Sequence, residues 1–202
     1  MAGGQHAIVP FRCEVCGARF TKTGGGACAQ CRRICCTTHL VTQLGSKAKL
    51  CAACANSGIR CARLRELPAG VQPLVTESEQ AGMMLVRRLV DEWLDGSNRF
   101  DRPGEALFGA WRDARLVGVC GLNIDPYADD NRIGRVRHLY VLVEARRHGV
   151  ARALMAETLA AARGRFPTLR LSTSNPAAAR LYESLGFRPV TERHCTHLLS
   201  LA

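Results

Sequence analysis

Four pairs of potential metal ligands, each pair separated by two residues, lie within the first 54 positions of the chain. They are Cys13 and Cys16, Cys28 and Cys31, Cys36 and His39, and Cys51 and Cys54. Two intervening residues let both side chains of a pair turn onto one ion, so eight ligands predict two tetrahedral zinc sites. The same stretch has few large apolar side chains and cannot bury an adequate core. Bound metal would therefore have to hold it folded.

The third pair is ambiguous because Cys35 directly precedes Cys36. A clamp of Cys35 with His39 is an alternative, but the regular spacing favours Cys36. Reduced thiols without metal are a second alternative, which would leave many reactive groups exposed. Alternation in a C-terminal strand explains residues 194–197, His-Cys-Thr-His, more simply than a metal cluster does. The remaining cysteines are expected to be small buried hydrophobic residues: Cys61, Cys120 and Cys195.

The run of pairs, with Phe20 shortly after the first, resembles a FYVE-type cross-brace finger over about residues 11–58. The resemblance implies that the first and third pairs share one ion and that the second and fourth share the other. FYVE fingers read a phosphoinositide through a basic cluster just before the third Cys. Here positions 24–27 are Gly-Gly-Gly-Ala. We therefore expect the fold to carry over, but not the lipid recognition.

Positive charge is concentrated at the front of the chain. Residues 1–73 carry ten Lys or Arg against two acids, a balance of +8, whereas residues 74–202 carry eighteen Arg against fifteen acids, a balance of +3. Such an excess suggests an acidic partner, namely nucleic acid, an anionic membrane surface or an acidic protein, or else a solvated basic face. The interleaved aromatic residues of a single-strand nucleic-acid reader are missing.

Two absences from the sequence indicate the compartment. No charged segment followed by an apolar run opens the chain, so we expect no signal peptide. No apolar run approaches 18 residues, so we expect no membrane span. A cytoplasmic location, with thiols kept reduced and free for zinc, fits both.

The pattern predicts three parts: a two-zinc finger over 1–60, a Pro- and Gly-containing linker over 61–73, and a larger domain over 74–202. In the larger domain, strands are expected at 74–76, 106–111, 116–124, 135–143 and 169–172, with one or two more in 187–201. Helices are expected at 77–95, 150–163 and from an Asn175 cap to Gly186. This order predicts an α/β fold with a mixed sheet and helices on both faces.

A glycine-containing turn precedes the helix expected at 150–163. It reads Arg146-Arg147-His148-Gly149-Val150-Ala151 and follows an apolar strand. The first N–H groups of a helix have no intrahelical acceptor, and three basic side chains lie beside them. This is the local chemistry of a phosphate site.

Together with Asn175 to Phe187, this turn resembles the two signature segments of the GNAT superfamily of acyl-CoA N-acyltransferases, over roughly residues 72–198. In that family two neighbouring strands of the central sheet splay apart and coenzyme A enters the gap. The resemblance implies a GNAT fold with a mixed, splayed central sheet. Backbone groups of Tyr140, Leu142 and Val143 would then pair with the pantetheine arm. The pyrophosphate would be held by Arg146, His148, Gly149, Val150, Ala151 and Arg152.

The resemblance also implies roles for two residues of the last helix. Asn175 sits where the family contacts the cofactor arm, and Tyr182 where its members commonly place a general acid for the departing thiolate. The alternative for Tyr182 is an aromatic residue packed in the core.

The general base is less defined. His138 is the best titratable group on the central strand, and a plain sheet residue is the alternative. A water relay ending at Glu105 or Asp125 is equally admissible. Asp125, Asp129 and Asp130 could attract a cationic amine or could serve only as turn residues.

These features predict an acetyl-CoA-dependent N-acetyltransferase. The expected acceptor is a primary amine of a protein, because a recruiting finger is unnecessary for small metabolites. The alternative is a zinc-finger adaptor or nucleic-acid-binding regulator whose second domain only senses acyl-CoA. A third hypothesis is acetylation of a small amine such as an aminoglycoside.

Overall fold

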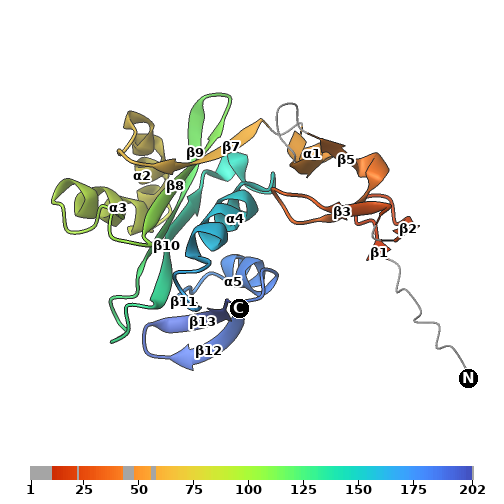
Figure 1. The fold of residues 1–202 in the computed structure, drawn as a ribbon. Coiled ribbons are helices and arrows are strands. Elements are labelled where there is room, and N and C mark those ends of the chain that lie inside the picture. The colour runs from red at the N-terminus through yellow and green to blue at the C-terminus, as the bar shows by residue number, and fades with distance from the viewer. Residues whose placement is uncertain (1–10, 22, 43–47, 56–57, 202) are drawn as a thin grey trace, which may run out of the picture. The chain divides into compact units, whose positions relative to one another are not determined.

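The computed structural model describes residues 11–21, 23–42, 48–55 and 58–201, and it divides the chain into two compact units (Figure 1). The first unit ends at Gly58 and the second begins at Ile59. Each unit has a separate cluster of buried side chains. Within the described residues, no helix has the length and apolar character that crossing a bilayer requires.

The first unit consists of three short antiparallel strand pairs. Strand β1 (Phe11–Arg12) pairs with β2 (Arg19–Phe20), β3 (Gly25–Ala27) with β4 (Ile34–Cys36), and β5 (Leu40–Thr42) with β6 (Lys49–Cys51). A 3-10 turn, η1 (Thr37–His39), links β4 to β5, and helix α1 (Ala52–Ala55) follows β6.

The buried interior of the first unit consists chiefly of cysteine side chains. Six cysteines are buried, and the hydrocarbon packed against them comes chiefly from Phe20, Leu40 and Leu50. The glycine run has a packing reason, since a Cβ at Gly25 would overlap the carbonyl of Cys35 and the ring of Phe20. The small hydrocarbon content agrees with the expectation that metal holds this unit folded.

The second unit is built on one seven-stranded sheet in the order β12-β13-β11-β10-β9-β8-β7. The strands are β7 (Ile59–Leu64), β8 (Ala106–Arg112), β9 (Arg115–Ile124), β10 (Ile133–Val141), β11 (Thr168–Leu171), β12 (Arg188–Glu192) and β13 (Cys195–Ser200). Only β10 and β11 pair in parallel, and every other neighbouring pair is antiparallel. The prediction of a mixed sheet is confirmed.

Helices cover both faces of this sheet. Helix α4 (Val150–Ala162) packs against β8, β9 and β10, while α2 (Gln72–Gln80) and α3 (Leu85–Leu94) lie on the opposite side (Figure 1). Helix α5 (Pro176–Glu183) follows β11, and short 3-10 turns occur at η2 (Ala69–Val71) and η3 (Val143–Ala145). As predicted, Asn175 caps α5, its side-chain oxygen accepting the N–H groups of Ala177 and Ala178.

Two expectations about the start of the second unit are wrong. The segment 61–73 is not simply a linker, because β7 occupies residues 59–64 and pairs with β8 at the edge of the sheet. The predicted strand at 74–76 and single helix at 77–95 are instead two helices. They are separated by a turn in which Gly82 has a φ of +71°. That angle ends α2, since it lies in the left-handed region that glycine favours.

Candidate active site and metal centres

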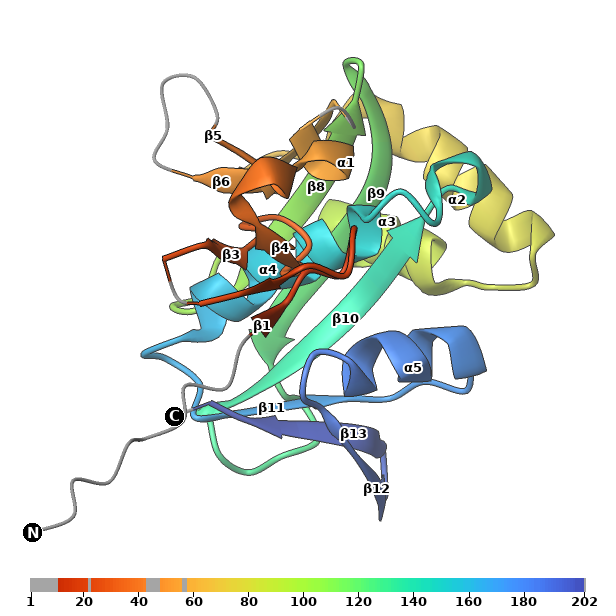
Figure 2. The same cartoon turned by 90° about the vertical axis from the view of Figure 1, so that its right-hand side faces the viewer.

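Strands β10 and β11 pair over only three residues and then separate. Their register runs from Ile133 opposite Thr168 to Arg135 opposite Arg170, although β10 continues to Val141. In the described part of the chain, residues 136–141 therefore lack a strand partner on the β11 side, and the two strands diverge (Figure 2). We call this opening the splay. Unpaired strand edges present N–H and C=O groups that an extended, amide-containing ligand can pair with.

A β-bulge in β10 decides which backbone groups face the splay. His138 and Leu139 together oppose one residue of β9, and His138 has a φ of +56°. After the bulge, the Leu142 N–H donates to Val117 of β9 at 2.9 Å. By alternation, Tyr140 also faces β9, while the groups of Val141 and Val143 face away from it. The expectation that backbone groups of Tyr140 and Leu142 face the gap is thus incorrect, and Val141 was missed.

Two backbone groups on the side of the splay, the Val141 carbonyl and the Val143 N–H, form hydrogen bonds with charged side chains. The guanidinium Nε of Arg146 donates to the Val141 carbonyl at 2.9 Å. The Glu77 carboxylate accepts both the Val143 N–H at 2.9 Å and the Tyr140 hydroxyl at 2.8 Å. Burial, then this carboxylate, raises the pKa of Tyr140 to about 12. Sequence reasoning missed Glu77, because its partners lie more than 60 residues away along the chain.

The N-terminus of α4 is open. Gly149 is its N-cap with a φ of +86°, no side chain caps the helix, and a Cβ on Gly149 would meet nothing within 4 Å. The first helical bond described is from the Ala153 N–H to the Gly149 carbonyl. Among the described contacts, the N–H groups of 150–152 have no acceptor, which leaves them available to an anion.

The basic residues around this turn differ in their availability. Arg146, Arg147 and His148 are exposed, although Arg146 is also held by Val141. Arg152 instead donates to the Ser184 hydroxyl at 2.7 Å and so links α4 to the end of α5. The expected pyrophosphate site therefore consists of the N–H groups of residues 150–152, with the exposed side chains of Arg147 and His148 beside them.

Tyr182 lies in the buried part of α5. Its ring packs on Phe187 at 5.7 Å and on His197 at 6.1 Å between centroids, and its hydroxyl makes no hydrogen bond within the described residues. Burial raises the pKa of this phenol. The phenol therefore stays protonated at neutral pH, as the expected role requires, but the raised pKa makes it a weaker proton donor.

His138 lies in an environment that opposes the role of base. Its Nδ1 is 2.7 Å from the Leu85 carbonyl, its ring packs on Phe100, and Nε2 lies 3.9 Å from a Glu92 oxygen. Burial, then the charge of Arg137, lowers the pKa of His138 to about 4. A group with so low a pKa has little driving force to take a proton from an ammonium ion.

The two carboxylates considered for a relay, Glu105 and Asp125, and one considered for attracting an amine, Asp130, are already engaged. Glu105 is buried and accepts from the Ile124 N–H and from Arg102, both at 3.0 Å. Asp125 is buried between Arg135 and Arg170, with each guanidinium at 3.4 Å. Asp130 pairs with Arg132 in the turn, and hydrogen bonds from that residue lower its pKa. Among these groups, none is a free base.

The first unit brings its eight predicted ligands together in two groups. One holds Cys13, Cys16, Cys36 and His39, the other Cys28, Cys31, Cys51 and Cys54, and the ligand atoms of each group lie within 4.8 Å of one another. These are the cross-brace partners expected from the first and third pairs and from the second and fourth. Cys35 is buried but belongs to neither group, so Cys36 is the better ligand.

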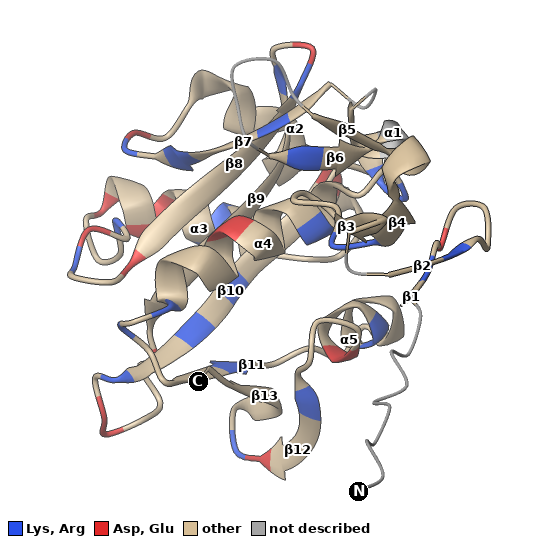
Figure 3. Ribbon diagram, turned by 45° about the vertical axis from the view of Figure 1, so that its right-hand side comes forward, with Lys and Arg blue, Asp and Glu red and all other residues tan. Residues whose placement is uncertain are grey.

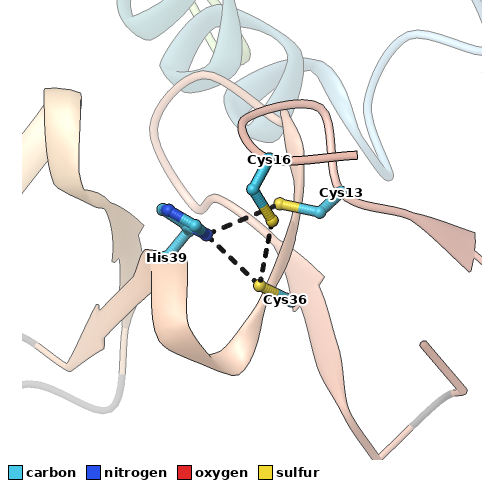
Figure 4. A group of neighbouring side chains, drawn as sticks. All are labelled: Cys13, Cys16, Cys36 and His39. Atoms are coloured by element: carbon cyan, nitrogen blue, oxygen red, sulfur yellow. Dashed lines mark hydrogen bonds between the residues drawn. The ribbon is translucent and has the colours of Figure 1, made fainter. Parts of the chain in front are cut away.

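The distances suit tetrahedral zinc. In the first group, Cys16 and Cys36 sulfurs are 3.9 Å apart, and the Nδ1 of His39 lies 3.3 Å from Cys36 and 3.8 Å from Cys13 (Figure 4). Two sulfurs bound to one zinc ion lie about 3.8 Å apart, given tetrahedral angles and Zn–S bonds of about 2.3 Å.

The second group has a similar geometry, with the Cys31 and Cys51 sulfurs 3.6 Å apart. The sulfur of Cys28 accepts the N–H groups of Cys31 at 3.5 Å and Cys51 at 3.2 Å. Burial would raise the pKa of Cys28, but such N–H donors outweigh it and lower the pKa to about 7. In the same group, burial raises the pKa of Cys31, to about 11, and that of Cys54.

Comparison with known proteins agrees with this geometry for the second unit. Residues 73–187 match the family model for Acetyltransferase (GNAT) family. An aminoglycoside N(6′)-acetyltransferase type 1 of Klebsiella aerogenes is 33% identical over 112 residues, which cover 52% of this chain and 72% of that relative. The family-model match, residues 73–187, lies outside the residues that carry the FYVE-like resemblance.

Solved structures give the same result. A protein of Exiguobacterium sp. 255-15 assigned as an acetyltransferase aligns with a TM-score of 0.64 at 30% identity, covering 70% of this chain and 93% of that one. A ribosomal-protein-alanine N-acetyltransferase of Brucella melitensis, at 21% identity and a TM-score of 0.52, covers 71% of this chain and 99% of its own and shares the fold. The chain therefore belongs to the acetyltransferase (GNAT) family.

Proposed function

We propose that the second unit transfers the acetyl group of acetyl-CoA to a primary amine, and that the first unit is a zinc-dependent module that recruits a protein acceptor. The observation that carries the transferase proposal is the splay beside the open N-terminus of α4. The splay offers backbone partners to an amide-containing arm, and the helix N-terminus offers N–H groups to its pyrophosphate. The Val141 carbonyl and Val143 N–H become available to the ligand if Arg146 and Glu77 move.

The charge distribution of the second unit fits an anionic donor and a cationic acceptor. Residues 74–131 carry eleven Asp or Glu against six Arg, whereas residues 132–202 carry four acids against twelve Arg (Figure 3). The basic half includes β10, α4 and α5, where the anion site lies. The acidic half includes α2 and α3, with Asp91 and Asp95 exposed. An ammonium group is attracted to such a surface.

The proposed reaction forms a C–N bond and breaks the C–S bond of the thioester. The amine nitrogen attacks the carbonyl carbon and loses a proton, and the departing sulfur gains one. Tyr182 supplies the proton to sulfur, since a phenol is protonated at neutral pH. The nitrogen gives its proton to water, because His138, Glu105 and Asp125 are engaged in the structure.

Thiol release from acetyl-CoA in the presence of amine probes tests this proposal. Suitable probes are a peptide with a free N-terminus and a lysine, and an aminoglycoside with a free 6′-amine. Tyr182→Phe is expected to lower kcat roughly 100-fold or more while leaving coenzyme A affinity unchanged by calorimetry. If the wild type shows neither amine-dependent turnover nor binding of coenzyme A at millimolar concentration, the proposed activity is wrong.

The zinc proposal has a separate readout. The two ligand groups would each hold one ion, whose coordination would replace the missing hydrocarbon core of the first unit. Elemental analysis of anaerobically prepared protein is expected to give two zinc ions per chain. A count near one, or none, would contradict the assignment of eight ligands.

A second acceptor class has a specific observation in its favour. The Klebsiella relative is named for an aminoglycoside acceptor, and it matches only part of the chain. Cys13→Ser combined with Cys16→Ser distinguishes the two classes. It should slow transfer to a protein acceptor that the finger recruits and leave transfer to an aminoglycoside unchanged. Binding of acetyl-CoA without turnover on either probe would instead favour the adaptor or regulator hypothesis, which salt-sensitive retention of nucleic acid would support.

A further inference from the structure

Helix α5 needs outside support to place Tyr182. It has only eight residues, and a helix of two turns is marginal without tertiary contacts. The Tyr182 hydroxyl has no hydrogen bond within the described residues, so it does not fix the ring. The position of the hydroxyl is therefore set by what packs on the ring and by what fastens the two ends of the helix.

Strand β13 contacts both ends of α5 through two adjacent residues. Before the helix, the Thr196 hydroxyl accepts the Thr173 N–H at 3.0 Å, and the Thr173 hydroxyl accepts the Asn175 N–H at 3.1 Å. At the last turn, Nε2 of His197 lies 3.7 Å from a Glu183 carboxylate oxygen. Between these points the His197 ring packs on Tyr182.

The hydrogen bonds of Thr196 orient the imidazole. Thr196 Oγ1 accepts from Thr173 and lies 2.8 Å from His197 Nδ1, to which it can donate its own proton. When Thr196 donates, the imidazole proton is on Nε2, which is buried, makes no hydrogen bond and lies 3.7 Å from a Glu183 carboxylate oxygen. The side chain is only 6% exposed, so water does not compete freely for it.

We infer that His197 is a positioning residue for Tyr182: held by Thr196 and drawn towards Glu183, its ring fixes where the phenol of α5 points. This inference rests on the proposed role of Tyr182 as the acid. It assigns His197 no proton transfer of its own, since it acts through the ring it packs against. A small displacement of an acid from its target reduces the rate strongly without altering donor binding.

The test is a double-mutant cycle on the full chain, with the amine probe that reacts best with the wild type. His197→Leu is expected to lower kcat about 10-fold with an unchanged KM for acetyl-CoA. Once Tyr182 is already Phe, adding His197→Leu should cost less than about twofold more. His197→Gln can donate to Glu183 but lacks the ring, so it should recover only part of the rate. The matched control is His194→Asn, at the exposed turn three positions earlier, which should leave kcat unchanged.

A readout without turnover completes the test. The chain has three tyrosines, so ¹³C labelling at the tyrosine ζ carbon gives few signals, and Tyr182→Phe identifies the one of interest. That signal should shift or broaden in His197→Leu and in Thr196→Val, and remain in place in His194→Asn. A normal kcat in Tyr182→Phe would show that Tyr182 is not the acid, so the proposed catalytic role would be wrong. If kcat fell in Tyr182→Phe but stayed normal in His197→Leu, only the positioning role of His197 would be wrong. Fully additive losses of kcat in the double variant would have the same meaning.

Discussion

Replacing Gly149 by Ala tests the anion site directly. Gly149 has φ +86° and ψ 0°, and an alanine there costs roughly 1–2 kcal/mol because its Cβ crowds the following carbonyl. The structure adds no packing cost, since a Cβ meets nothing within 4 Å. The free energy of unfolding should therefore fall by that amount alone. The melting temperature should fall by roughly 2–8 °C.

The chain offers a matched control at the other end of the same helix. Gly164 follows α4, has a φ of +75°, and a Cβ at that position would also lie in open space. Gly164→Ala should thus destabilise the protein by a similar amount. Only Gly149→Ala places a methyl group beside the free N–H groups of 150–152. There it should weaken coenzyme A binding at least about 10-fold, or about 1.4 kcal/mol.

Calorimetric titration of both variants with coenzyme A, at a temperature where both are folded, separates the two effects. Weakened binding by Gly149→Ala alone supports a pyrophosphate site at the α4 N-terminus. Equal affinity in both variants and the wild type would refute it. Equal loss in both would show that strain anywhere in α4, and not a local anion contact, governs binding.

Three further predictions concern stability and metal content. Glu77→Ala leaves the Tyr140 hydroxyl and a backbone N–H without an acceptor, so it should lower the free energy of unfolding by about 1–2 kcal/mol in denaturant titrations, and Glu77→Gln should recover most of it. Cys35→Ser should retain two zinc ions by elemental analysis, whereas Cys36→Ser should retain one firmly bound ion. The depressed pKa of His138, about 4 when folded against about 6.5 when unfolded, stabilises the second unit above pH 6.5. The free energy of unfolding should therefore fall by roughly 3 kcal/mol as the pH falls from 6.5 to 4. Unfolding followed by tryptophan fluorescence should show a smaller fall for His138→Asn.

Most of the features that the sequence predicted depend on the spacing of residues that are close together in the chain. A pair of ligands two residues apart shares an ion whatever the rest of the fold does, and the regular spacing of Cys36 and His39 selected the ligand that the structure places in the first group. The strand, glycine turn and helix around Gly149 follow equally from neighbouring residues. The mixed sheet follows from the order of these elements.

The errors arose where distant contacts or one inserted residue decide the outcome. The bulge at His138 reverses which backbone groups of β10 face the splay, and no composition signal marks it. Glu77 meets its partners only after α2 folds onto the sheet. Strand β7 carried only a weak signal, since the exposed Arg60 lies between the more buried Ile59 and Cys61 but Arg63 breaks the alternation, and the prolines and glycine after it favoured a linker.

The different interiors of the two units imply that metal removal separates their roles. The first unit buries chiefly cysteine, so losing zinc removes most of what holds it folded. The second has a continuous hydrocarbon core around residues such as Leu107, Leu154 and Leu169, and none of its described residues belongs to a metal group. A chelator should therefore unfold the finger while leaving coenzyme A binding intact. Transfer to an aminoglycoside should then persist, and only transfer that depends on recruitment should be lost. If chelation instead abolished coenzyme A binding, the division of labour proposed for the two units would be wrong.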